Sequence, residues 1–351
     1  MPAELLLTDR TAECPKHMEF GPCGGVEFDG TCEVGAAAGG PGRCVFLDTP
    51  VVRWHGGDAS PVADAPGASR MRELLATKQI VVTDFPARAL DATSLAACAA
   101  VLRGTTDVVL AGDSGRERVQ FPPAYRTALI RAEGVDVWSG FTCRDRNRVA
   151  MEAELAALAH AGVSGVHCVT GDHTRTGSRP DAAPVFDLDS TQAAALARAA
   201  GHLVSVAEAP ATPPVERRPA RLLEKERAGA EICFVNHAGG VEPVATFIAE
   251  AQALGSRLGF IPCIPIVLDR ASAELLKSFT TLVLPPGYLD RILAAADPRG
   301  EGIAAAVELG RGFQAIDGVV GVNLSGGTGF GGELEFARAL AEIATELGRA
   351  A

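Results

Sequence analysis

The sequence contains no run of about 18 or more apolar residues, the least that a membrane-spanning helix requires. Its first ten residues, Met1 to Arg10, lack the basic start and long apolar segment of a secretory signal. We therefore expect a cytoplasmic protein with no membrane partner. A basic excess is also lacking, since the formal net charge is −11, which disfavours nucleic acid as a partner.

Two short motifs are missing as well. No G-x-G-x-x-G opens a helix after a first strand, so an open dinucleotide-binding sheet lacks its usual signature. No C-x2-C pair occurs among the 9 cysteines. In a cytoplasmic chain we expect these thiols to be reduced, buried or metal-bound rather than paired in disulfides. Hydrophobic residues make up 47% of the 351 positions, which predicts a sizeable core.

The composition changes twice along the chain. Residues 1–54 hold four cysteines and many glycines, and we predict that they form a small cysteine-rich, metal-binding module. Residues 55–70 are small, polar and proline-containing, as expected of a linker. From residue 71 to 351, apolar strands alternate with helices such as 147–161 and 332–348. This alternation predicts a parallel sheet covered by helices.

Eight strand and helix units fit a closed (β/α)8 TIM barrel of the α/β class better than an open doubly wound sheet. The strands are predicted at 79–85, 107–112, 135–142, 165–171, 203–208, 231–236, 258–267 and 318–324. In such a barrel, chemistry belongs to the C-terminal ends of the strands. The polar residues at those ends include Thr83, Asp84, Asp113, Thr142, Asp172, Glu208, Asn236 and Asn323.

Several segments carry a family resemblance. Residues 140–177 contain a strand ending in Thr-Cys, a helix, an Ala-Gly turn and a strand ending in Gly-Asp. This arrangement resembles the third and fourth units of methylenetetrahydrofolate reductases. The segments 183–190, 224–236, 259–267, 284–293 and 318–326 resemble later units in the same order. The resemblance extends over residues 75–345 and points to the acetogen and actinobacterial branch of the family.

The resemblance implies an oxidoreductase that reduces 5,10-methylenetetrahydrofolate to 5-methyltetrahydrofolate, with NAD(P)H as electron source and FAD as hydride carrier. Opening the methylene bridge to an iminium requires a general acid. Asp172 matches a family aspartate close to both flavin and folate, which makes it a candidate for catalysis and for binding both molecules. The other implied contacts are Asn236 and Asn323 for the folate, and Thr142, Gly171, Asp189 and Lys225 for the flavin.

Ordinary structural roles stay open for the matched residues. Asp172 could cap the following helix, and Asn236 could satisfy loop backbone. Lys225 could be a solvated helix lysine, and Thr142 an ordinary β-branched strand residue.

The first strand departs from the family pattern. The family carries a catalytic glutamate there, but in VTDFPAR (82–88) Thr83 occupies its place and Asp84 lies beside it. Thr83 is therefore predicted to face the substrate, and strict register would turn Asp84 away unless a bulge brings it inward to act as the acid. Glu208 and Asp113 are alternative acids. Gly140 and Thr170 replace a family histidine and arginine that help to hold flavin.

The cysteine-rich module has the spacing C-x8-C-x8-C-x11-C, formed by Cys14, Cys23, Cys32 and Cys44. Four thiolates in a short, core-poor segment favour tetrahedral Zn²⁺, with an Fe–S cluster or unmetallated thiols as alternatives. His17 could replace one ligand. The segment also resembles a zinc-binding module that accompanies relatives of this reductase, often in a partner subunit.

Two other functions remain open at this point. The barrel could reduce another imine, or it could be a non-catalytic folate-binding partner of a reductase. A homo-oligomer or a complex with a partner reductase subunit is compatible with either one. The other five cysteines are predicted to be small buried hydrophobic residues.

Overall fold

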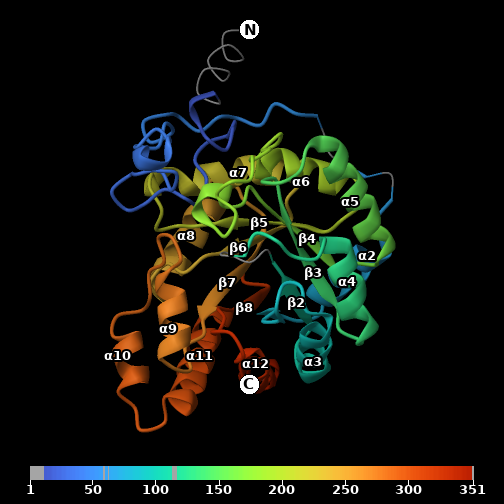
Figure 1. Cartoon of the computed structure of the whole chain (residues 1–351), viewed down its shortest axis with the longest axis vertical. Coiled ribbons are helices and arrows are strands. Elements are labelled where there is room, and N and C mark those ends of the chain that lie inside the picture. Colours follow the sequence, from blue (N-terminus) through green and yellow to red (C-terminus); the bar gives the residue numbers. More distant parts are fainter. Residues whose placement is uncertain (1–11, 58–59, 62, 113–116, 350–351) are drawn as a thin grey trace.

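The computed structural model describes residues 12–57, 60–61, 63–112 and 117–349. Its main body is a closed barrel of parallel strands that follow chain order from β1 to β8, with β8 paired to β1 (Figure 1). Both the predicted fold class and the eight predicted strands are confirmed. The strands are β1 Ile80–Asp84, β2 Val108–Ala111, β3 Val137–Thr142, β4 Gly165–Val169, β5 Val204–Glu208, β6 Ile232–Val235, β7 Gly259–Pro265 and β8 Gly321–Ser325.

Helices surround the barrel, and three of them lie between β7 and β8. No helix in the described part of the chain is both long and apolar enough to cross a membrane. The α-helices are α2 Pro66–Leu75, α3 Ala92–Leu102, α4 Pro123–Ala132, α5 Arg148–His160, α6 Ser190–Ala199, α7 Arg218–Arg227, α8 Val241–Ala253, α9 Arg270–Lys277, α10 Tyr288–Leu293, α11 Pro298–Gln314 and α12 Glu333–Gly348; the 3-10 turns are η1 Ala36–Ala38, η2 Thr174–Thr176 and η3 Val215–Arg217.

The strands are buried on both faces, which explains their near-continuous apolar sequences. In β1, Ile80 and Val82 pack with Phe234 in the barrel interior, whereas Val81 packs in the outer core with the helices. Met71 of α2 also belongs to the interior cluster. Helix α2 therefore closes the N-terminal end of the barrel. It begins at Pro66, inside the range 55–70 that the sequence suggested as a linker, so that range is only partly a linker.

The described part of the N-terminal segment lies against α6 and α7 (Figure 1). It has little regular structure beyond η1 and two isolated bridges, one between Val26 and Cys32 and one between Thr31 and Arg43. Its own core is small and includes Cys14, Met18 and Phe46. A segment with so small a core depends on other contacts for its stability. We call residues 12–54 the cysteine module.

Candidate functional site

The C-terminal mouth of the barrel is open to solvent above a filled interior. Deeper inside, the inward-facing Phe234 is 1% exposed. Nearer the mouth, Leu110, Val169 and Ala207 face inward by strand alternation but are partly exposed, and Asn236, just after β6, is exposed. We call this region the barrel mouth. Its partly exposed apolar side chains and few polar groups lie at the end of the barrel where ligands bind in this fold, which makes it the candidate site for a small organic ligand.

Asp84 at the end of β1 faces the barrel interior. Its side chain lies on the same face of β1 as those of Ile80 and Val82, and its carboxylate accepts a hydrogen bond from Asn323 of β8. The Thr83 side chain lies on the opposite face of β1 and is fully buried, so it faces the helices. The orientation expected from the sequence was the reverse and is wrong. No bulge is involved, because β1 pairs with β2 and β8 in continuous register.

The Asp84 carboxylate accepts hydrogen bonds from Asn323, Ser325 and Gly326. Its Oδ1 accepts from Asn323 Nδ2 at 3.0 Å, and its Oδ2 accepts from the Gly326 backbone N–H at 3.2 Å. Burial raises the pKa of Asp84 to about 6, although these hydrogen bonds oppose the change. A carboxyl group with such a pKa can exchange a proton near neutral pH.

The end of β3 and the loop after β4 form another side of the mouth. Thr142 is the last residue of β3, and its side chain faces the barrel interior. It is buried and accepts a hydrogen bond from Arg146 at 3.2 Å. Gly171 packs on it so closely that a Cβ there would lie 3.1 Å from the Thr142 Cβ. The Asp172 side chain is 55% exposed and lies 3.8 Å from Arg118. Thr142, Gly171 and Asp172 are therefore brought together, with Asp172 available to a ligand.

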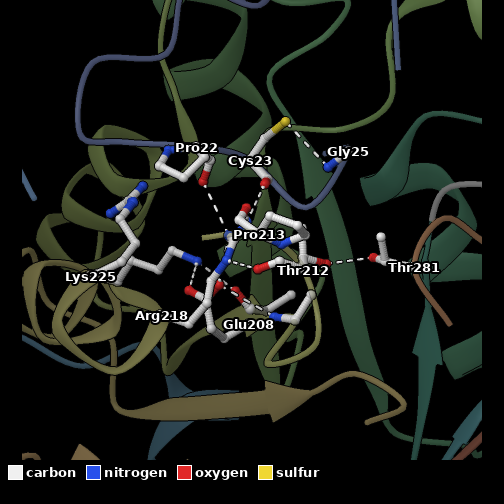
Figure 2. Close-up of polar contacts among 12 residues, drawn as sticks. Pro22, Cys23, Gly25, Glu208, Thr212, Pro213, Arg218, Lys225 and Thr281 are labelled. Carbon is white, nitrogen blue, oxygen red and sulfur yellow. Dashed lines mark hydrogen bonds and ion pairs between the residues drawn. The ribbon is translucent and has the colours of Figure 1, made fainter. Parts of the chain in front are cut away.

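Glu208 at the end of β5 lies in a buried network rather than at an open position (Figure 2). Its carboxylate contacts Arg218 at 3.1 Å and Lys225 at 2.8 Å. Burial alone would raise the pKa of Glu208, but these two cations lower it to about 2. Glu208 therefore stays ionised near neutral pH and is unsuited to donate a proton. The other alternative acid, Asp113, lies outside the described residues.

Lys225 and Asp189, which the family resemblance implies as flavin contacts, make contacts inside the protein instead. Lys225 is buried, and its Nζ donates to Glu208 and to the Ala207 carbonyl at 2.6 Å. It is therefore not a solvated helix lysine either. Asp189 is fully buried and caps α6, while its other oxygen accepts the backbone N–H groups of Glu19 and Phe20, both at 3.2 Å. We assign Lys225 and Asp189 to holding the fold together.

The four cysteines of the module line a single small pocket together with Lys16. Its cavity volume of about 20 Å³ is enough for one ion or water molecule. All four are free thiols, and burial raises the pKa of Cys14 to about 12 and that of Cys44 to about 11. Among the described residues, no three His, Cys, Asp or Glu side chains converge into a set that could hold a metal as they stand.

A buried ion pair connects the cysteine pocket to the barrel. Lys16 Nζ lies 2.7 Å from Glu33, and both side chains are almost fully buried. Glu33 in turn accepts the backbone N–H of His173 at 2.8 Å, directly after Asp172. On the other side, Arg218 Nη2 donates to the Cys23 carbonyl at 3.2 Å (Figure 2). The module is thus attached to the loop that follows β4 and to the first residue of α7.

Sequence reasoning did not identify Lys16, Glu33 or Arg218. Glu33 and its partner His173 are 140 positions apart, and Arg218 is 195 positions from Cys23. No local spacing marks such pairs. The only signal was the presence of charged residues in a segment with little core. The five other cysteines, predicted to be buried hydrophobic residues, are confirmed as buried: Cys98, Cys143, Cys168, Cys233 and Cys263.

Comparison with known proteins identifies the fold. No family model matches the sequence, and no curated protein is significantly similar to it. Among solved structures, an uncharacterized protein from Clostridium thermocellum, described as binding two copies of 5-methyl-5,6,7,8-tetrahydrofolic acid, is similar with a TM-score of 0.56 and 11% identity over 78% of this chain and 98% of that one. A 2,3-dimethylmalate lyase of the PEP mutase/isocitrate lyase superfamily gives a TM-score of 0.41 and 14% identity over 74% of this chain and 78% of that one. At 11% identity, the likeness to the Clostridium thermocellum protein is one of fold alone.

Proposed function

We propose that this chain binds a reduced folate at the barrel mouth and reduces 5,10-methylenetetrahydrofolate to 5-methyltetrahydrofolate with NAD(P)H. The observation that carries the proposal is the inward carboxyl group of Asp84, with a pKa of about 6, at the open end of the barrel. This reaction needs a general acid, and a carboxyl group buried enough to stay partly protonated suits that task.

Two further observations support a folate as the ligand. The order of motifs over residues 75–345 resembles methylenetetrahydrofolate reductases. A solved structure with the same fold, from Clostridium thermocellum, is described as binding 5-methyl-5,6,7,8-tetrahydrofolic acid. The partly exposed apolar side chains at the barrel mouth suit a flat heterocycle, and the exposed amide of Asn236 can both donate to and accept from the edge of a pterin ring.

Asp84 is proposed to protonate the folate nitrogen N10. The bond between N10 and the methylene carbon then breaks, and the other nitrogen, N5, forms an iminium with that carbon. A hydride from the dihydronicotinamide adds to the carbon, and the C=N electron pair returns to N5, giving the methyl product and NAD(P)⁺. Asn323 holds the Asp84 carboxyl in place, and the exposed Asp172 carboxylate would stabilise the cation.

The residues do not fit the flavin that the family resemblance implies. Lys225 and Asp189 use their polar atoms inside the protein, and Gly140 and Thr170 replace a family histidine and arginine. We therefore derive no step through a flavin. Direct hydride transfer from NAD(P)H is the mechanism proposed.

The four cysteines are proposed to hold a structural Zn²⁺, with an Fe–S cluster as the alternative. The donor set fits, since four thiols line one cavity of about 20 Å³ that is large enough for a single ion. Metal binding would displace the thiol protons and draw the side chains together. A site with four protein ligands leaves no open position, so its role would be to order the cysteine module on the barrel.

An anaerobic assay of the purified chain tests the function. Methylenetetrahydrofolate and NADH or NADPH are supplied, with and without FAD, and methyltetrahydrofolate is followed. Product without FAD is the expected result. Product only with FAD would overturn direct transfer while keeping the reductase. No product, with tight binding of 5-methyltetrahydrofolate, would favour a folate-binding partner subunit. No product and no folate binding would overturn the proposal and favour another imine substrate.

A further inference from the structure

A second pocket lies between the cysteine module and the start of α7, separate from the cysteine pocket. Phe20 and Gly21 line it from the module, and Arg217, Arg218 and Arg221 line it from the barrel. Its cavity volume is about 10 Å³, which is room for one water-sized group such as an oxygen atom. Arg217 and Arg218 donate to carbonyl groups, and Arg218 also to Glu208, so a negatively charged occupant would be held by Arg221.

Arg221, which lines this pocket, has hydrogen-bond donors without a partner among the described residues. Its side chain is 1% exposed, and only Nη2 is paired, donating to Thr191 Oγ1 at 2.8 Å. Its Nε and Nη1 are buried and have no hydrogen-bond partner among the residues that the structure describes. A buried charged donor without a partner costs free energy, so such an atom calls for an explanation.

Gly21 leaves space beside these donors. A Cβ at this position would lie 3.3 Å from Arg221 Nε and 3.1 Å from its Cδ. The φ angle of Gly21 is +122°, which a residue with a side chain rarely adopts. Any other residue would therefore strain the backbone and narrow the pocket at the Nε atom.

Charges of both signs surround Arg221. Helix α7 begins at Arg218, and its N-cap Arg217 makes no capping hydrogen bond, so the positive end of the helix dipole lies at the pocket. Three carboxylates act on Arg221, namely Asp189, Glu208 and Glu224. Each of them accepts hydrogen bonds from other groups, and none reaches the free Nε and Nη1 atoms.

We propose that this pocket binds an oxyanionic group, a phosphate or a carboxylate, with one oxygen bonded to Nε and Nη1 of Arg221. The rest of the anion would lie toward solvent, where Pro50 at the rim is exposed. The anion would contact Phe20 and Gly21 of the module and the guanidinium of the barrel at once. Binding therefore fastens the module to the barrel and stabilises the folded chain.

The test is a titration of the full chain with inorganic phosphate or with glutarate at constant ionic strength, followed by calorimetry and by Tm. At least one anion should bind saturably and raise Tm. Phosphate alone would identify a phosphate site, and glutarate alone a carboxylate site. Absence of saturable binding of both would overturn the proposal, whatever the variants do.

Substitutions locate the binding. Arg221→Met should abolish it, and Arg221→Lys, which keeps the charge but loses the Nε and Nη1 pair, should weaken it at least about tenfold. The matched control is Arg338→Met, at an exposed arginine paired with Glu335 on α12, which should leave the titration unchanged. Unaltered anion binding by Arg221→Lys would overturn the assignment of the site to Arg221. If Arg221→Met does not fold, Arg221→Lys alone provides the test.

Discussion

Asn323 Nδ2 donates a hydrogen bond of 3.0 Å to Asp84 Oδ1 across the seam where β8 pairs with β1 and closes the barrel. The contact places a carboxyl group inside the mouth of the barrel and fixes its direction. Burial then gives that group a pKa of about 6. The proposed reaction depends on this one pair more than on any other contact in the molecule.

The first prediction concerns pH. As a general acid, Asp84 must be protonated, so turnover should fall by up to about tenfold per pH unit above pH 6. The folded-state pKa lies above the usual 3.8, so the stabilisation is present below about pH 4 and is lost as pH rises through 6. The free energy of unfolding should fall by a total on the order of 3 kcal/mol over this pH range.

Urea unfolding of wild type and Asp84→Asn between pH 4 and 8 measures this dependence. The neutral variant should give a flatter curve than wild type. Asp181→Asn, at an exposed loop residue, is the control and should follow wild type. Parallel curves for wild type and Asp84→Asn would show that Asp84 does not titrate in this range.

The second prediction concerns Glu208. Glu208→Gln leaves Arg218 and Lys225 buried without their counter-charge, so we expect a loss of about 3–5 kcal/mol in the free energy of unfolding. Glu216→Gln removes a carboxylate that is 69% exposed and should change stability little. Denaturant titration of both variants at pH 7 provides the comparison. Equal stability of the two would contradict the role assigned to Glu208.

Because its folded-state pKa of about 2 lies below the usual 4.5, Glu208 has its own pH signature. Its stabilisation is present above about pH 4.5 and is lost as pH falls toward 2. The wild type should therefore lose stability over this acid range faster than Glu208→Gln does.

The third prediction concerns the cysteine pocket. The purified chain should contain one equivalent of zinc, and Cys23→Ser or Cys44→Ser should lower both the metal content and Tm. Cys98→Ser, in the buried face of α3, is the control and should keep its zinc. Cobalt substitution should give the absorption of a four-thiolate tetrahedral site. An iron-containing, coloured protein would indicate an Fe–S cluster instead, and a metal-free wild type would contradict the metal assignment.

The barrel was predictable because each strand is buried on both faces and appears in the sequence as an apolar run. The orientation of Asp84 was not readable from the strand, because Val81 on the outer face is as apolar as Ile80 and Val82 on the inner face. Matching the family glutamate to Thr83 led to the wrong face. A one-residue difference in register exchanges the two faces of a strand.

The docking of the cysteine module was not predictable from the sequence. Its attachments join residues 137 or more positions apart, such as Glu33 with His173 and Cys23 with Arg218. Lys225 illustrates the same limit. Its position on α7 allowed either a solvated or a ligand-binding side chain, and only the packing of Glu208 against it shows that it is an internal ion pair.

Turnover of wild type, Asp84→Asn and Thr83→Val, measured side by side with methylenetetrahydrofolate and NAD(P)H under anaerobic conditions, tests the central claim most directly. These neighbours on β1 face opposite sides of the strand. We predict that Asp84→Asn lowers kcat by at least about 100-fold with little change in the Kd of 5-methyltetrahydrofolate, while Thr83→Val retains wild-type activity. Full activity in Asp84→Asn, or its loss in Thr83→Val alone, would contradict the account.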